Sequence, residues 1–298
     1  MNQLQNILIT GSSSGFGFLT ARTLLHHGYT VFASMRGIEN KNAEAAARLK
    51  RTAAETDGRL HLLDLDVTDS ASVQRAVRQA QDAAGEIHVA VNNAGFGVGG
   101  LAETVTIEQF RRQFDINLFG VQRIMQAVLP GMRRRGQGLI INISSIMGRV
   151  VIPFAAAYTA SKYALEGLSE SYRYELSGTG VDVVIIEPGG FGTNFMANMI
   201  AGADTDRLTT YGPLAELPDK LWSGVDSRLS GQDAPSPQDI ADAVLRLIQT
   251  PAGKRPLRTV VDPLMGGQAP RTINQTTEQI QAQLFENMQL EELLSVKE

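Results

Sequence analysis

The chain has 298 residues, 43% of them hydrophobic, which is enough to bury one large core. Its net charge is −4, so its composition has no basic excess that would suggest a nucleic-acid partner, and we expect none. It contains no cysteine, which excludes a disulfide framework and cysteine-ligated metal sites, and we expect no metal site of any kind.

The sequence also lacks membrane and secretion signals. No apolar run approaches the ~20 residues that cross a bilayer. Residues 1–5 lack the positive start and long apolar stretch of a signal peptide. The absence of cysteine suits a reducing compartment. We therefore expect a cytoplasmic protein with no membrane span.

The first elements of the chain are a strand, a glycine-rich turn and a helix. Residues 6–10 are mostly apolar and predict a buried strand. Residues 11–17 read Gly-Ser-Ser-Ser-Gly-Phe-Gly, and apolar residues recur at helical spacing over 18–25. The backbone N–H groups of such a turn, at the positive end of a helix dipole, bind a pyrophosphate. The context favours dinucleotide binding over an ordinary turn.

The same turn also fits a competing motif, the G-x-S-x-G nucleophile elbow of serine hydrolases. Only ten residues precede Gly11, whereas an elbow follows earlier strands and an oxyanion loop. The four histidines all lie in the first third of the chain, not downstream where a catalytic histidine belongs: His26, His27, His61 and His88. A hydrolase is therefore the less favoured enzyme.

Strands and helices alternate through the rest of the chain. Further strands are predicted at residues 30–35, 60–65, 87–91, 139–143, 181–186 and 258–261, with helices at 41–55 and 70–84. Strands separated by helices pair in parallel and are covered on both faces. We expect one α/β domain over residues 1–298, with a doubly wound parallel sheet of the Rossmann type.

Two segments depart from this alternation. Residues 202–237 are rich in Gly, Pro, Asp and Ser and show no sustained periodicity. A connection of this length is usually functional, and a plain surface excursion is the alternative. Residues 271–298 look helical and polar, and we expect a C-terminal helical extension there.

A phenol and an ammonium are spaced for acid–base chemistry. Tyr158 and Lys162 are four residues apart, so a helix would bring them onto one face. A phenol ordinarily loses its proton near pH ~10. A neighbouring cation favours the phenolate, so we expect Lys162 to lower the pKa of Tyr158 and make it a usable proton donor or acceptor.

Taken together, these motifs resemble the short-chain dehydrogenase/reductase family. Further matches follow in order: Asn92-Asn93-Ala94-Gly95, an isolated Asn117, Ser144-Ser145, and Pro188-Gly189 followed by Thr193. The resemblance covers about residues 4–262. Through residues 163–170 it is closest in motif to the hydroxysteroid and retinol dehydrogenase-like branch. It implies an NAD(P)-dependent oxidoreductase acting on a small carbonyl or alcohol, assembled as a homodimer or homotetramer.

The resemblance also implies residue roles. It makes Tyr158 the proton donor or acceptor, Lys162 its electrostatic partner and a ribose ligand, Ser145 the holder of the substrate oxygen, and Asn117 part of a proton relay. A buried structural asparagine is the alternative for Asn117. The residues implied to bind the cofactor are Gly11, Ser12, Ser14, Gly15, Phe16, Gly17, Arg36, Asp66, Val67, Asn93, Ala94, Gly95, Tyr158, Lys162, Pro188, Gly189, Phe191 and Thr193. Residues 192–237 would form a lid over the substrate.

The choice between the two nicotinamide cofactors depends on the end of the second strand. An acidic residue there binds the ribose hydroxyls of NAD. This chain has Met35 followed by Arg36, which favours a 2′-phosphate and hence NADP(H) over NAD(H). Ser12 would add a hydroxyl to the phosphate. The alternative is that Arg36 points into solvent.

Apolar residues surround the active tyrosine in the sequence. Val98, Met147, Phe154 and Trp222 are the candidates for contact with a hydrophobic substrate, although apolar residues near a core are often only core. The alternative function is a cofactor-sensing regulator that does no chemistry. The intact set of four catalytic candidates favours an enzyme.

Overall fold

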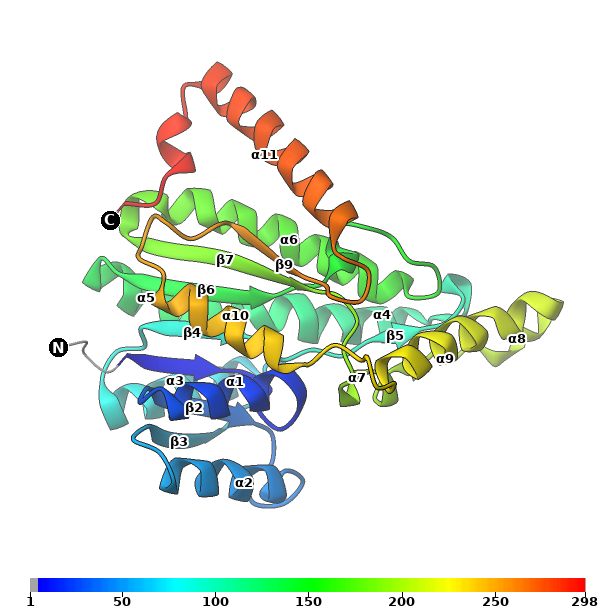
Figure 1. The fold of residues 1–298 in the computed structure, drawn as a ribbon, viewed down its shortest axis with the longest axis horizontal. Helices are drawn as coiled ribbons and strands as arrows, with labels where there is room; N and C mark the ends of the chain where they lie inside the picture. The colour runs from blue at the N-terminus through cyan, green and yellow to red at the C-terminus, as the bar shows by residue number, and fades with distance from the viewer. Residues whose placement is uncertain (1–4, 298) are drawn as a thin grey trace.

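Seven parallel strands form the main sheet of the computed structural model, which describes residues 5–297 (Figure 1). They are β1 (Asn6–Ile9), β2 (Thr30–Met35), β3 (Arg59–Asp64), β4 (Val89–Asn92), β6 (Gly138–Ile143), β7 (Val181–Pro188) and β9 (Arg258–Val261). Their order is β3-β2-β1-β4-β6-β7-β9, so the winding direction reverses between β1 and β4. This confirms the predicted doubly wound sheet, and such a reversal is where α/β folds bind ligands.

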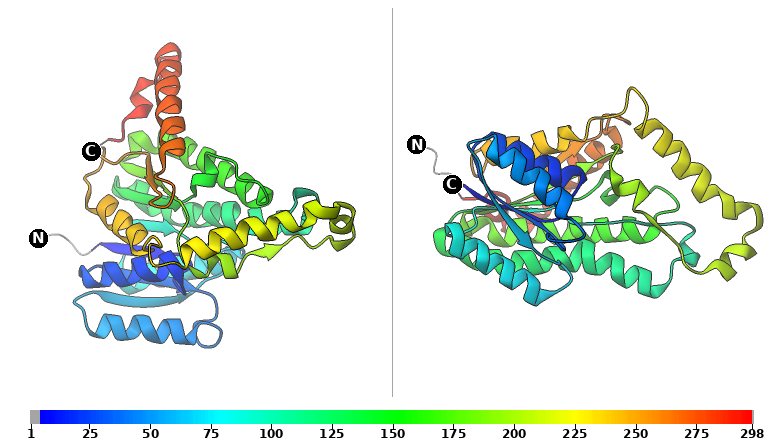
Figure 2. Two further views of the ribbon diagram at one scale, coloured as in Figure 1. Left: turned by 45° about the vertical axis from the view of Figure 1, so that its right-hand side comes forward. Right: turned by 90° about the horizontal axis from the view of Figure 1, so that it is seen from below.

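Helices cover both faces of the sheet. One layer contains α1 (Gly15–His26), α2 (Ala43–Ala54) and α10 (Gln238–Gln249), and the other contains α3 (Ser70–Ala84), α5 (Gly120–Arg135) and α6 (Ala156–Leu176). The right-hand view of Figure 2 shows the strands between these layers. Within β1, Ile7 and Ile9 pack into the first layer and Leu8 into the second. Burial on both sides explains why the strands are continuous apolar runs.

The predicted elements agree with the structure except at some boundaries. The fourth strand starts at Val89, two residues later than predicted, and extends to Asn92. His88 precedes it and accepts a hydrogen bond from the Asn6 backbone N–H through Nδ1, at 3.0 Å. His61 stacks on Phe32 with ring centroids 4.7 Å apart. Both rings therefore have partners within the fold.

The segment predicted to lack regular structure is largely helical, which corrects the sequence analysis. It contains α8 (Thr205–Thr210), the 3₁₀ turn η5 (Gly212–Glu216) and α9 (Leu217–Leu229), preceded by α7 (Asn194–Ala197). A short strand β8 (Ile200–Ala201) pairs with β5 (Val98–Gly99). No residue of α8 is buried, so its sequence needs no apolar stripe, and the periodic signal is missing for that reason.

The C-terminal helix α11 (Gln268–Met288) begins three residues before the predicted start and projects from the body of the molecule (Figures 1 and 2). The chain then turns back through η6 (Glu291–Leu294), and the Lys297 N–H donates to the Ser177 carbonyl. The remaining elements are η1 (Ala102–Thr104), α4 (Ile107–Phe114), η2 (Asp115–Phe119), η3 (Ile146–Gly148) and η4 (Ser177–Thr179). Among residues 5–297, every helix is too short or too polar to cross a membrane.

Candidate functional site

The glycine turn after β1 forms a cradle that larger residues would fill. Gly11 and Gly15 have φ angles of +71° and +51°, which L side chains rarely adopt. A Cβ on Gly17 would overlap the Gly11 carbonyl oxygen and the Asn93 side-chain amide. Ser14 is the exposed N-cap of α1 and makes no capping hydrogen bond through its side chain. The turn therefore leaves a hydroxyl and a helix N-terminus available to a phosphate, which fits a dinucleotide.

Two residues that the sequence analysis assigned to the cofactor instead hold this turn together. The Asn93 side-chain amide donates to the carbonyl oxygens of Thr10 and Gly11, at 2.9 and 3.1 Å. The hydroxyl of Ser12 donates to the Ile9 carbonyl at 3.1 Å, and Ser12 is fully buried. The structure therefore does not support the expected phosphate contact of Ser12, because its side chain is part of the turn's interior.

The residues after β7 lie against the cradle. A Cβ on Gly15 would be 3.6 Å from the Thr193 Cβ, and Thr193 caps α7 by accepting from the Phe195 N–H. The rings of Phe16 and Phe191 meet edge to face, with centroids 5.5 Å apart. The structure thus brings the predicted cofactor residues after β1 and after β7 to one place.

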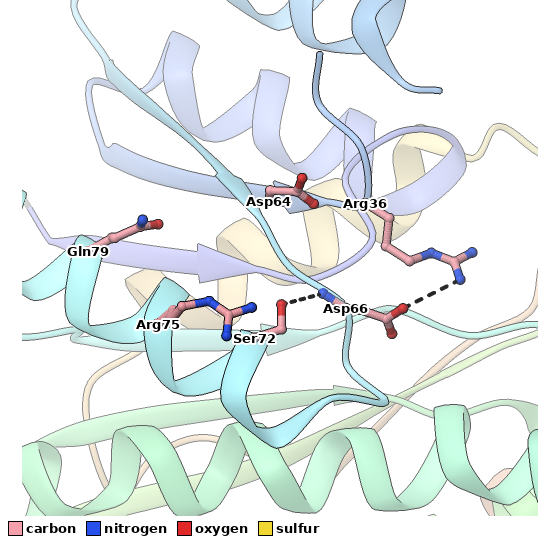
Figure 3. Close-up of a pocket in the computed structure, with 6 residues that line it drawn as sticks. All are labelled: Arg36, Asp64, Asp66, Ser72, Arg75 and Gln79. Atoms are coloured by element: carbon pink, nitrogen blue, oxygen red, sulfur yellow. Dashed lines mark hydrogen bonds and ion pairs between the residues drawn. The ribbon is translucent and has the colours of Figure 1, made fainter. Parts of the chain in front are cut away.

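A cavity of about 440 Å³ lies beyond the ends of β2 and β3 (Figure 3). It is lined by Arg36, Asp64, Asp66, Ser72, Arg75 and Gln79. The Arg36 guanidinium faces Asp66, with Nη1 3.9 Å from Oδ2, and 55% of the Arg36 side chain is exposed. Asp66 also accepts hydrogen bonds from the N–H and the hydroxyl of Thr68. Burial alone would raise the pKa of Asp66, but these two hydrogen bonds and the positive charge of Arg36 hold it below its usual value.

Asp64 is a carboxylate that the sequence analysis did not consider. The β2–β3 register places it beside Met35, and its Oδ1 accepts from the Gly37 N–H at 2.9 Å. The pocket therefore combines two guanidinium groups with two carboxylates. Val67, another cofactor candidate, is buried against Gly120 at the start of α5.

Helix α6 brings Tyr158 and Lys162 onto one face, as their spacing predicted. The Lys162 Nζ lies 5.6 Å from the centre of the Tyr158 ring and donates to the Ile143 carbonyl at 2.8 Å. Ile143 ends β6, directly before Ser144 and Ser145. The lysine thus connects the α6 face to the end of the neighbouring strand.

The pKa of Tyr158 shifts in the direction opposite to the one expected from Lys162. Burial raises it to about 12, and a hydrogen bond with the Ser145 side chain opposes that rise. The pKa of Lys162 falls to about 8, mainly because burial disfavours its charge, while the Glu166 carboxylate opposes the fall. Desolvation outweighs the pairing of charges here, so the phenol keeps its proton at neutral pH.

Ser145 and Asn117 lie on either side of this pair. Ser145 is buried at the N-cap of η3, where its hydroxyl accepts from the Met147 N–H at 3.1 Å. Asn117 lies in the π-helical segment η2, which joins α4 to α5. Its side chain donates to the Phe96 carbonyl and to the Ser161 hydroxyl, at 3.0 and 3.2 Å. Irregular π turns inside helices often mark functional positions.

The other cofactor candidates lie along the same edge of the sheet. Ala94 donates its backbone N–H to the Thr10 hydroxyl, and a Cβ on Gly95 would be 3.3 Å from the Asn117 Oδ1. Pro188 ends β7, and a Cβ on Gly189 would overlap the Asp262 carboxylate. Both glycines therefore occur where backbone and side chain approach closely.

The substrate candidates divide into two groups. Met147 and Trp222 pack in one cluster with Tyr158, and the Trp222 indole donates to the Phe154 carbonyl at 3.2 Å. Phe154 has a φ of +66°, which is unusual for a bulky residue. Val98 is 1% exposed and packs in a separate cluster with Val105 and Ala157.

Phe195 is a residue that the sequence analysis missed. Its ring lies against Tyr158, with centroids 5.3 Å apart, and a Cβ on Gly97 would come within 2.9 Å of it. It belongs to α7, at the start of the segment proposed as a lid. No local pattern indicated it, because Gly97, Tyr158 and Phe195 come from distant segments of the chain. Among residues 5–297, no group of three or more His, Cys, Asp or Glu side chains is arranged to hold a metal ion.

Comparisons with known proteins agree with this geometry. Residues 5–204 match the family model described as short chain dehydrogenase. A 3-ketodihydrosphingosine reductase of Bacteroides thetaiotaomicron is 41% identical over 196 residues, covering 66% of this chain and 67% of the relative. Retinol dehydrogenase 8 of Homo sapiens is 37% identical over 260 residues, covering 83% and 78%.

A solved structure extends the agreement over nearly the whole chain. The crystal structure of a short-chain dehydrogenase from Streptomyces avermitilis has a TM-score of 0.75 and 30% identity, covering 97% of this chain and 98% of the other. The glycine cradle, the Tyr158–Lys162 face and every strand of the main sheet except β9 lie in the segment that the family model matches. The chain therefore belongs to the short-chain dehydrogenase family, as an NAD(P)-dependent oxidoreductase.

Proposed function

We propose that this enzyme prefers NADP(H) and transfers a hydride between the nicotinamide and the carbonyl or secondary alcohol of a hydrophobic small molecule. The observation that carries the proposal is the meeting of Tyr158, Lys162 and Ser145 beside a glycine cradle. When bound, the nicotinamide supplies or accepts the hydride. The chain's own residues bind and orient the cofactor and the substrate, and they move the proton.

Tyr158 is the proposed proton donor in the direction of reduction. Because its pKa is about 12, the phenol carries a proton at neutral pH and has one to give. Its hydrogen bond with Ser145 aims both hydroxyls at one oxygen of the substrate, and that arrangement stabilises developing negative charge. Lys162 contributes positive charge beside the tyrosine, and Asn117 is proposed to connect this site to water through its buried amide.

NADP preference is proposed from the cavity at the end of β2. Arg36 is partly exposed there, Arg75 lines the same cavity, and guanidinium groups suit a phosphate. Asp64 and Asp66 would repel a phosphate, and their hydrogen bonds do not remove that charge, so the proposal requires the guanidinium groups lining the cavity to outweigh the two carboxylates. The remaining proposed contacts come from Ser14, the glycine cradle, Ala94, Gly95, Pro188, Gly189, Phe191 and Thr193.

A hydrophobic substrate is proposed from the apolar wall around Tyr158. Met147 and Trp222 pack in one cluster with Tyr158, and the Phe195 ring lies against the Tyr158 ring. Trp222 and Phe195 belong to the segment 192–237 that we propose as a lid. The two relatives described above are named for retinol and for 3-ketodihydrosphingosine, which are both lipids. A lipid-like ketone or alcohol is therefore the substrate class to test first.

The test compares NADPH and NADH oxidation across long-chain, retinoid, steroid and aromatic carbonyls. Arg36→Ala removes one charge-assisted contact worth about 1.5–3 kcal/mol, so the Kd for NADPH should rise about tenfold or more while the Kd for NADH changes little. Arg111→Ala is the matched control, because Arg111 is an exposed arginine of α4 that is paired with Glu108. Equal losses for both cofactors in Arg36→Ala would refute the phosphate contact.

A further inference from the structure

The face of α6 that carries Tyr158 and Lys162 continues to Glu166 and then to Glu170, each four residues further on. Lys162 and Glu166 are only 6% and 2% exposed. Burial raises the pKa of Glu166, because a buried charge is costly unless it is paired, so its carboxylate needs partners close by to stay ionised. Neither glutamate has a part in the chemistry proposed above.

The guanidinium of Arg258 interacts with three carboxylates near the proposed active site. The Arg258 Nε donates to the Glu166 Oε2 at 2.9 Å, its Nη2 donates to the Glu170 Oε2 at 2.6 Å, and Nε lies 3.5 Å from the Glu187 Oε1. Three carboxylates against one arginine leave negative charge that this arginine does not cancel. Lys162, on the next turn of α6, is a further buried cation.

The C-terminal helix closes the far side of this cluster. The Asn274 side chain of α11 donates to the Glu187 Oε2 at 2.8 Å. Burial and the nearby Glu166 carboxylate together raise the pKa of Glu187 to about 7, against the lowering effect of Asn274 and Arg258. Glu187 precedes Pro188 and Gly189, so the cluster extends from the α6 face to the end of β7.

We propose that Glu166 is a positioning residue that holds Lys162 in its charged form, with Arg258 fixing the carboxylate in place. The part of the proposal that concerns catalysis rests on the function proposed above. Two observations carry it: the i to i+4 spacing of Lys162 and Glu166 inside the protein, and the hydrogen bond that ties Glu166 to Arg258. The charged and titratable groups around the pair are Tyr158 and Glu170 on α6, Arg149 after η3, Glu187 on β7 and Arg258 on β9.

The first measurement is an NMR titration of the protein labelled with ¹³C at lysine Cε, with Lys162→Arg identifying the Lys162 resonance. The native midpoint is expected near the pKa of about 8. Glu166→Gln removes the carboxylate one helical turn from Lys162, so the midpoint should fall by about one to two pH units. Glu170→Gln is the matched control, because it also takes a carboxylate from Arg258 but lies one helical turn further from Lys162.

The second measurement is the pH profile of carbonyl reduction by the same variants. Activity that needs the ammonium declines as the pH rises through the Lys162 pKa, so Glu166→Gln should move this decline to lower pH while Glu170→Gln leaves it in place. A movement of the NMR midpoint without a movement of the profile would overturn the role given to Lys162, but the electrostatic coupling would stand. Superimposable midpoints in the native protein and Glu166→Gln, or equal shifts in both Gln variants, would overturn this proposal.

A folding defect is separated from the electrostatic effect by a third variant. Glu166→Asp keeps the charge but shortens the side chain, so its Lys162 midpoint should stay within about half a unit of the native value even if its stability falls. Thermal unfolding of all variants at one pH measures that stability. A midpoint in Glu166→Asp as low as that in Glu166→Gln would count against the charge as the cause.

Discussion

Gly11→Ala tests whether the cradle depends on the close approach of two backbones. Gly11 has a φ of +71°, and an added Cβ would lie 2.9 Å from the Ala94 Cα, against the 3.4 Å at which ordinary contact begins. The left-handed conformation costs a non-glycine residue about 1–2 kcal/mol. The overlap with backbone, which cannot rotate away, adds about 1–3 kcal/mol. We expect the free energy of unfolding to fall by about 2–5 kcal/mol in total, and we expect weaker NADPH binding.

Gly28→Ala supplies the matched control for this prediction. Gly28 has a φ of +77°, and within the described chain no heavy atom outside its own neighbours lies within 4 Å of an added Cβ. It should lose only the conformational part, about 1–2 kcal/mol, and bind NADPH normally. Urea unfolding followed by Trp222 fluorescence measures stability, and NADPH fluorescence titration measures binding. Equal destabilisation of the two variants, or native NADPH affinity in Gly11→Ala, would refute the reasoning.

Three further predictions concern the acid–base residues and the α6 helix. Tyr158→Phe should lower kcat by about 10²- to 10⁴-fold and leave the NADPH Kd unchanged, and turnover near the native rate would remove Tyr158 from the chemistry. Because the pKa of Glu187 rises from 4.5 to about 7 on folding, its stabilising contribution is complete below pH 4.5 and is lost as the pH rises through 7. Between pH 4.5 and 8 the free energy of unfolding of the native protein, measured in urea, should therefore fall by up to about 3 kcal/mol relative to that of Glu187→Gln. Parallel plots of the unfolding free energy against pH for the two proteins would contradict the pKa shift. Gly167→Ala fills open space on an exposed helix face and should gain about 1 kcal/mol in the same assay, and a loss would show an unrecognised contact.

The strands and the acid–base face were predictable because their signals are local. A strand buried on both sides is a largely apolar run, and β2 (Thr30–Met35), buried throughout, occurs at its predicted residues. The spacing of Tyr158 and Lys162 likewise places them together in any helix. The helices α8 and α9 were missed because α8 buries no residue, and the polar character of that segment suggested a loop.

The sequence by itself therefore determined the order of the elements, the glycine cradle and which side chains share the α6 face. Only the tertiary structure decided the electrostatics of the site, because desolvation depends on what packs around a group. It raised the pKa of Tyr158, where the neighbouring cation alone predicted a fall. It also placed Asp64 beside Met35 through strand register and joined Glu166, Glu187 and Arg258 from three elements. Contacts between distant segments have no local pattern, so no spacing along the chain encodes them.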